Sequence, residues 1–186
     1  VMSITGHPGG PPTRVGTSVG DLTAGLFALG AINAALYERE RTGLGRMIDV
    51  SMLDSQIAIL ENAVARYAVT GKPPGPLGAR HPSITPFEAY ETQDGHLIIA
   101  AGNNKLFTDL CSGLNRPDLA TDPRFLTNSD RAANVDALKT ELETTLKTKP
   151  TAHWLNVLDA AGVPHGPINN VEQALNDPQV RARNMV

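Results

Sequence analysis

The chain has 186 residues, of which 41% are hydrophobic, 19% charged and 4% aromatic, and its formal net charge is −3. This composition is typical of a folded globular protein and excludes a disordered chain. The acidic balance, the few aromatic rings and the scattered Lys and Arg argue against a nucleic-acid surface, which needs clustered cations and stacking rings. The single cysteine, Cys111, cannot form an intrachain disulfide, so we expect a reducing, cytoplasmic setting.

The chain begins with a Gly- and Pro-rich loop that leads into a long apolar helix. Residues 6–16 carry so many Gly and Pro that neither a helix nor a central strand can cross them. From Asp21 the apolar residues follow the helical period, and Gly43 marks the end. Because this helix is apolar nearly all round, we expect it to be buried. Its longest apolar stretch, 26–37, is shorter than the roughly 20 residues of a membrane span, and the first residues show no signal-peptide pattern.

The segment after this helix predicts a strand, a second helix and a domain border. Alternating apolar residues predict a short strand over 46–50. Ser51, three residues before Asp54, resembles a capping box and predicts a helix that runs to about Val69. Residues 71–82 show no periodicity and are held extended by their prolines, so we place a domain border there.

The second half of the chain predicts a hairpin followed by helices. The runs 87–92 and 96–101 flank Asp94-Gly95, a typical tight-turn pair. Three helical faces then follow, ending at Gly162. The tail 163–168 reads as extended and precedes two short helical pieces. The predicted helical faces lie at 106–114, 135–146 and 154–161.

Several motifs are too weak to carry a function. The run 16–20 matches the G-x-S-x-G nucleophile elbow, but a Pro/Gly loop precedes it where that elbow needs a buried strand, so a hydrolase is disfavoured. Cys111 shares a helical face with apolar residues and is expected in the core. The histidines show no metal-ligand spacing, so no metal site is predicted. They are His7, His81, His96, His153 and His165.

Asp21 is the most informative polar residue, and the residues alone leave two interpretations open. An aspartate in the first turn of a helix is explained by capping of the free backbone N–H groups. However, Gly16 and Gly20 would let a ligand approach the backbone closely, and the preceding loop is long. A carboxylate in such a place can also act as a nucleophile.

A series of short motifs runs along the whole chain in a fixed order. They are Gly20-Asp21-x-x-x-Gly25, Thr42-Gly43-x-Gly45-Arg46, His81-Pro82-Ser83-Ile84, Asp94-Gly95-His96, Gly102-Asn103-Asn104, Asp122-Pro123-Arg124-Phe125 and Ala161-Gly162-Val163-Pro164, after the Gly- and Pro-rich run at 6–16. In this order they resemble the class III CoA-transferase (CaiB/BaiF) family. Each motif is weak alone, but so many in register are specific.

The resemblance implies an α/β fold. In that family a Rossmann-like large domain is joined by linker helices to a small α/β domain, and two ring-shaped monomers interlock into a homodimer. Residues 1–51 would end the first part of the large domain, 52–83 would form a linker helix and the Pro/Gly loop, 84–162 the small domain, and 163–186 the return to the large domain. The family's N-terminal half, with most of the CoA nucleotide pocket, would lie outside this chain, so we expect a fragment that is inactive alone.

The resemblance also implies the chemistry. The family's catalytic aspartate matches Asp21, which would accept an acyl group from a CoA thioester and then carry CoA itself. Gly20 would give access to CoA, and Arg80 and His81 are candidates for binding the acceptor acid. The implied substrates are an acyl-CoA and a small carboxylic acid, such as succinyl-CoA and a dicarboxylate, with no permanently bound cofactor and no membrane or nucleic-acid partner. If the protein is not cytoplasmic, the mitochondrial matrix is the alternative.

Three other functions stay open at this stage. An α-methylacyl-CoA racemase would need a second acid/base near Asn103-Asn104, where amides cannot take up a proton at neutral pH. A dehydratase partner role with a carnitine-type substrate is a further possibility within the fold. A non-catalytic binding module is the alternative from another class, and it would show no acyl exchange with any acid.

Overall fold

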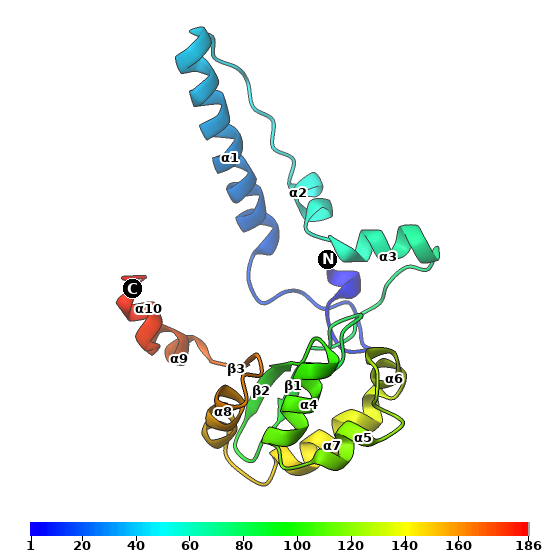
Figure 1. Cartoon of the computed structure of the whole chain (residues 1–186). Coiled ribbons are helices and arrows are strands. Elements are labelled where there is room, and N and C mark those ends of the chain that lie inside the picture. The colour runs from blue at the N-terminus through cyan, green and yellow to red at the C-terminus, as the bar shows by residue number, and fades with distance from the viewer. Residues whose placement is uncertain (186) are drawn as a thin grey trace. The chain divides into compact units, whose positions relative to one another are not determined.

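A computed structural model describes residues 1–185 and divides the chain into two compact units, Val1–Gly78 and Ala79–Val186. The division falls within the proline-rich segment 71–82, where the sequence predicts a border. Figure 1 shows both units, with the first formed by one long helix, short helices and loops and the second by a small sheet among helices.

The regular secondary structure of the first unit is helical throughout. Its long helix α1 (Val19–Thr42) closes at Gly43, which adopts a left-handed φ of 73° and donates its N–H to the Arg39 carbonyl. A residue without a Cβ takes this conformation at little cost, so the predicted helix end is confirmed. The remaining helices are η1 (Met2–Ile4), α2 (Met52–Ala58) and α3 (Asn62–Thr70).

Two local predictions for the first unit are wrong. Residues 46–50 form no strand, because an extended segment becomes a strand only beside a pairing partner, and residues 1–78 contain none. The single helix predicted from Ser51 to Val69 is divided into α2 and α3 by a break at which Glu61 has a φ of 43°. No glycine or proline marks this break, so periodicity could not reveal it.

The α1 helix also differs from its predicted burial. None of its residues is buried, and Leu26 is 69% exposed. Apolar periodicity predicts that a helix face will be covered, but it does not say which segment covers it. By length and composition the helix Val19–Thr42 contains a stretch apolar enough to cross a membrane, a test that core helices of soluble proteins also pass. The expected absence of a membrane partner therefore stays a prediction.

The second unit is built on a three-stranded antiparallel sheet in the order β1-β2-β3. The predicted hairpin is confirmed, with β1 at Phe87–Glu91 and β2 at His96–Ala100. The extended tail forms β3 (His165–Pro167), which pairs with β2. The helices are α4 (Asn104–Gly113), α5 (Pro117–Thr121), α6 (Asn128–Ala133), α7 (Val135–Leu146), α8 (Thr151–Ala160), α9 (Val171–Asn176) and α10 (Pro178–Ala182).

One hydrophobic core holds the second unit together. The buried residues of β1 and β2 share this core with a row of leucines spaced four apart on α7, the spacing that aligns side chains on one helix face. Cys111 lies in this core, as predicted, and burial raises the pKa of its thiol to about 12. The thiol therefore stays protonated and unreactive at neutral pH. The core includes Tyr90, Leu97, Ile99, Phe107, Leu110, Leu138, Leu142, Leu146 and Leu158.

Candidate functional site

Asp21 is the third residue of α1 and lies in its first turn with an exposed side chain. Within residues 1–185 its carboxylate takes part in no hydrogen bond and no ion pair, and the N-cap position belongs to Ser18. The capping interpretation is therefore not realised by the side chain. What remains, among the described residues, is an exposed carboxylate without a protein partner in the first turn of a helix.

Gly20 lets a second helix approach the start of α1. A Cβ at this position would lie 3.3 Å from Nε2 of Gln56 on α2, closer than an ordinary van der Waals contact. The residue next to Asp21 is thus packed against a side-chain amide, a group that can donate hydrogen bonds to an oxyanion. Sequence reasoning missed Gln56, because a lone glutamine in a helix belongs to no motif.

A pocket of about 320 Å³ lies beside α1 and α2 in the first unit. Its acidic groups are Asp49 and Asp54, and the Asp54 backbone N–H donates to Ser51 Oγ over 3.1 Å, which is the predicted N-cap of α2. The pocket does not include Asp21. Its lining residues are Phe27, Ala31, Asp49, Val50, Ser51, Asp54, Ser55 and Ala58.

His81 and Arg80 lie in the loop that opens the second unit. The His81 ring is half-buried and stacks on Phe87 with ring centroids 5.1 Å apart and planes 3° from parallel. Its Nδ1 accepts hydrogen bonds from the backbone N–H groups of Ser83 and Ile84. The neighbouring Arg80 side chain makes no hydrogen bond or ion pair within the described part of the chain, so its guanidinium is available for an anion.

Asn103 and Asn104, which bear on the racemase alternative, both have structural roles. Asn103 caps α4 by accepting from the Leu106 backbone N–H over 2.9 Å. Asn104 Oδ1 accepts from the buried Arg131 guanidinium over 3.0 Å. Neither amide can exchange a proton with a substrate carbon at neutral pH.

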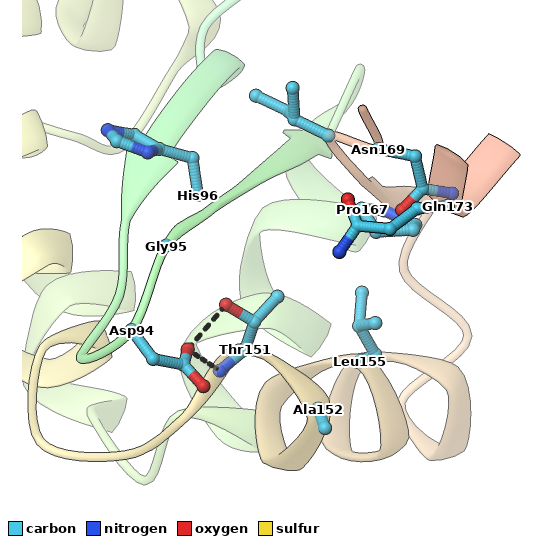
Figure 2. A pocket seen from close by; sticks show the side chains of 10 residues that line it. Asp94, Gly95, His96, Thr151, Ala152, Leu155, Pro167, Asn169 and Gln173 are labelled. Atoms are coloured by element: carbon cyan, nitrogen blue, oxygen red, sulfur yellow. Dashed lines mark hydrogen bonds between the residues drawn. The ribbon is translucent and has the colours of Figure 1, made fainter. Parts of the chain in front are cut away.

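A larger pocket, of about 500 Å³, lies in the second unit and contains none of the predicted site residues (Figure 2). Its one carboxylate, on Asp94, accepts from the Thr151 backbone N–H over 2.7 Å and from Thr151 Oγ1 over 2.8 Å. The Gln173 amide oxygen accepts from the Asn170 N–H. These polar groups close the hairpin and cap α9, so the Asp94 carboxylate and the Gln173 amide are both engaged in holding the local structure.

The described residues 1–185 also contain no cluster of His, Cys, Asp and Glu that could hold a metal ion. The fold is that of a mixed α/β protein in which a small antiparallel sheet is packed among helices.

Comparison with known proteins places this α/β chain in a family. It matches CoA-transferase family III over residues 1–186 and belongs to that family. It is 51% identical over its whole length to an acetyl-CoA:oxalate CoA-transferase of Acetobacter aceti and covers 48% of that protein. It is 40% identical to the mouse succinyl-CoA:glutarate CoA-transferase and covers 43% of it.

Solved structures agree with this assignment. The crystal structure of a CaiB/BaiF family protein from Brucella suis superposes with a TM-score of 0.85 at 40% identity, over 99% of this chain and 49% of that one. Rv3272 from Mycobacterium tuberculosis gives a TM-score of 0.83 at 26% identity. The family and the α/β fold class predicted from sequence are confirmed, and the chain spans about half the length of the curated relatives that it matches.

Proposed function

We propose that this chain forms half of a CoA-transferase that moves CoA from an acyl-CoA donor to a small carboxylic acid. The relatives support this class of reaction, because they are named for CoA transfer to oxalate and glutarate. The observation that carries the proposal is the exposed, unpaired carboxylate of Asp21 in the first turn of α1. A nucleophile must be unobstructed, and this carboxylate is exposed and has no partner among the described residues.

The proposed reaction proceeds through covalent intermediates on Asp21. The carboxylate attacks the thioester carbonyl and expels the CoA thiolate, which gives a mixed anhydride. The thiolate then attacks the aspartyl carbonyl, releases the donor acid and leaves an aspartyl-CoA thioester. The acceptor carboxylate attacks this thioester and frees the thiolate, which finally attacks the acceptor's acyl carbonyl and restores Asp21. Gly20 gives access at this point, and the Gln56 amide is a candidate donor to the oxyanion formed at each attack.

Arg80 and His81 are proposed to hold the acceptor acid. A guanidinium and an imidazole N–H in neighbouring residues suit the recognition of a carboxylate. A dicarboxylate with succinyl-CoA as the donor fits this pair, since the second carboxylate needs a cationic partner. We also propose that the active protein is a homodimer, that it works in the cytoplasm or mitochondrial matrix, and that the 186 residues alone do not turn over.

Racemisation is the weaker candidate. It would require a proton acceptor and donor at the substrate's α-carbon, and the amides of Asn103 and Asn104 are engaged in capping α4 and binding Arg131. A non-catalytic binding module would leave the free carboxylate of Asp21 without a role.

The test compares two aspartates in the full-length protein that contains this chain. Asp21→Asn should abolish CoA transfer from succinyl-CoA to a panel of acids, because an amide cannot accept the acyl group. Mass spectrometry should find CoA linked to the Asp21 peptide of the unaltered protein. Asp136, which is likewise exposed in the first turn of a helix, supplies the control, and Asp136→Asn should keep full activity.

Two outcomes would contradict the proposal. Full transfer by a folded Asp21→Asn protein, with deamidation excluded by sequencing the product, would remove the nucleophile assignment. Absence of transfer by the unaltered protein with every acid would favour the binding module instead.

A further inference from the structure

The second unit buries a charged side chain that no carboxylate neutralises. Arg131 on α6 is 0% exposed and forms no ion pair within residues 1–185. Its guanidinium donates to the Thr85 carbonyl over 2.7 Å and to the Phe125 carbonyl over 3.0 Å, and it stacks on the Phe107 ring at 4.5 Å. Burying an unpaired charge costs free energy unless its hydrogen bonds are made. The hydrogen bonds of Arg131 hold the backbone of two loops, at Thr85 and at Phe125.

Asn128, one turn earlier on α6, binds the same loop as Arg131. Its Nδ2 donates to the Ser83 carbonyl over 2.9 Å, and its Oδ1 accepts from the Thr85 N–H over 3.0 Å. With the Arg131 bond to Thr85, three hydrogen bonds fasten residues 83–85 to α6. The two residues thus act as an anchor for a loop that has no regular secondary structure of its own.

The anchored loop in turn fixes the His81 ring. The N–H groups of Ser83 and Ile84 point at His81 Nδ1 over 3.2 and 3.1 Å, and the His81 backbone N–H donates to the Phe87 carbonyl over 2.8 Å. A nitrogen that accepts from backbone N–H groups carries no proton, so in the neutral ring the proton is on Nε2. Nε2 has no partner among the described residues.

We propose that Asn128 and Arg131 are positioning residues that fix the loop 81–85 so that His81 presents its Nε2–H as a donor to a carboxylate of the acceptor acid. This inference rests on the proposed CoA transfer. A fixed imidazole ring offers one directed hydrogen bond from Nε2, whereas the adjacent Arg80 offers charge. Together they would distinguish a planar carboxylate from an uncharged group of the same size.

The first experiment measures transfer kinetics of full-length variants. Asn128→Ala removes two bonds to the loop and is preferred to a change at the fully buried Arg131. It should raise the KM for the acceptor acid about tenfold, the size expected for losing a hydrogen bond to a charged group, and leave the KM for the acyl-CoA donor unchanged. Asn134→Ala is the matched control, since Asn134 also bonds two carbonyls, those of Arg124 and Asp130, but does not touch the loop.

A double variant separates positioning from general destabilisation. His81→Phe keeps a ring on Phe87 but lacks both nitrogens, so it should raise the acceptor KM by at least as much. If Asn128 acts through His81, the double variant Asn128→Ala/His81→Phe should be no worse than His81→Phe alone. Nuclear magnetic resonance of the chain, labelled at the histidine nitrogens, should show His81 protonated on Nε2 and show this preference lost in Asn128→Ala.

The possible outcomes distinguish failure of the positioning role from failure of the proposed CoA transfer. An acceptor KM in Asn128→Ala equal to that of Asn134→Ala, effects that multiply in the double variant, or a proton on Nδ1 of His81 would each overturn the positioning role while transfer persists. No transfer by the unaltered protein overturns the proposed function, and this inference with it.

Discussion

At the scale of single residues, some polar side chains are hydrogen-bonded within the protein and others have no partner among the described residues. Asp94, Asn103 and Arg131 are held by backbone groups and each closes a turn, a helix end or a loop. The carboxylate of Asp21 and Nε2 of His81 have no such partner among the residues described. Both residues also lie in the motifs that resemble the CoA-transferase family, so we propose that a ligand binds at these two groups.

Asp94 supplies a prediction about pH at this scale. Its hydrogen bonds from the Thr151 backbone N–H and hydroxyl hold the pKa of the carboxyl below its ordinary value of 3.8. A carboxyl whose pKa is lower in the folded state adds stability above its unfolded pKa and loses it as the pH falls through the folded value. The free energy of unfolding of Asp94→Ala should therefore lie below that of the unaltered chain at neutral pH.

The same difference should shrink as the pH falls below 3.8. Denaturant unfolding of Asp94→Ala and of the unaltered chain, measured across this acid range, tests this decrease. Asp136→Ala, which removes an exposed carboxylate without a hydrogen bond, should show no comparable trend. An Asp94→Ala difference that stays constant down to the lowest pH would contradict the linkage to Thr151.

At the scale of elements, the sequence predicted the boundaries that depend on nearby residues. It did not predict the contacts between residues far apart in the chain. Gly43 and the Asp94-Gly95 turn fixed the end of α1 and the hairpin correctly, because both act within a few residues. The pairing of β3 with β2 could not be predicted, since it joins residues about seventy apart in the chain and depends on the folded core. The same limit applies to the site: Asp21 follows from a motif, whereas Asn128 and Arg131 become informative only once folding brings them to residues 83–85.

A comparison of two leucines in apolar helical segments tests how strongly α7 and α1 depend on burial. Leu142 on α7 is 0% exposed and Leu26 on α1 is 69% exposed, although both lie in apolar helical patterns. Leu142→Ala should lower the free energy of unfolding by about 2–5 kcal/mol, through lost burial and the cavity left behind. Leu26→Ala should change it by no more than about 0.5 kcal/mol, as is usual at exposed sites. Equal losses in chemical denaturation would show that α1 is covered in this chain.

At the scale of the whole molecule, the core is concentrated in one unit. Apart from Ala63, every buried apolar side chain in residues 1–185 belongs to the second unit. Burial of apolar surface is the main favourable term in folding, so the two units should differ widely in stability. The proposed nucleophile Asp21 therefore stands on the unit with the weaker core, and His81 on the unit with the stronger one.

Hydrogen exchange should display this difference directly. Residues 79–186 should fold alone and unfold cooperatively, and within the 186-residue chain the amides of β2 and α7 should exchange only through global unfolding of that unit. The amides of α1 should exchange much faster, because an exposed helix is held by its own hydrogen bonds and little else. Mass spectrometry of peptides after timed exchange measures both. Protection of α1 equal to that of α7 would mean that the apolar face of α1 is covered in solution.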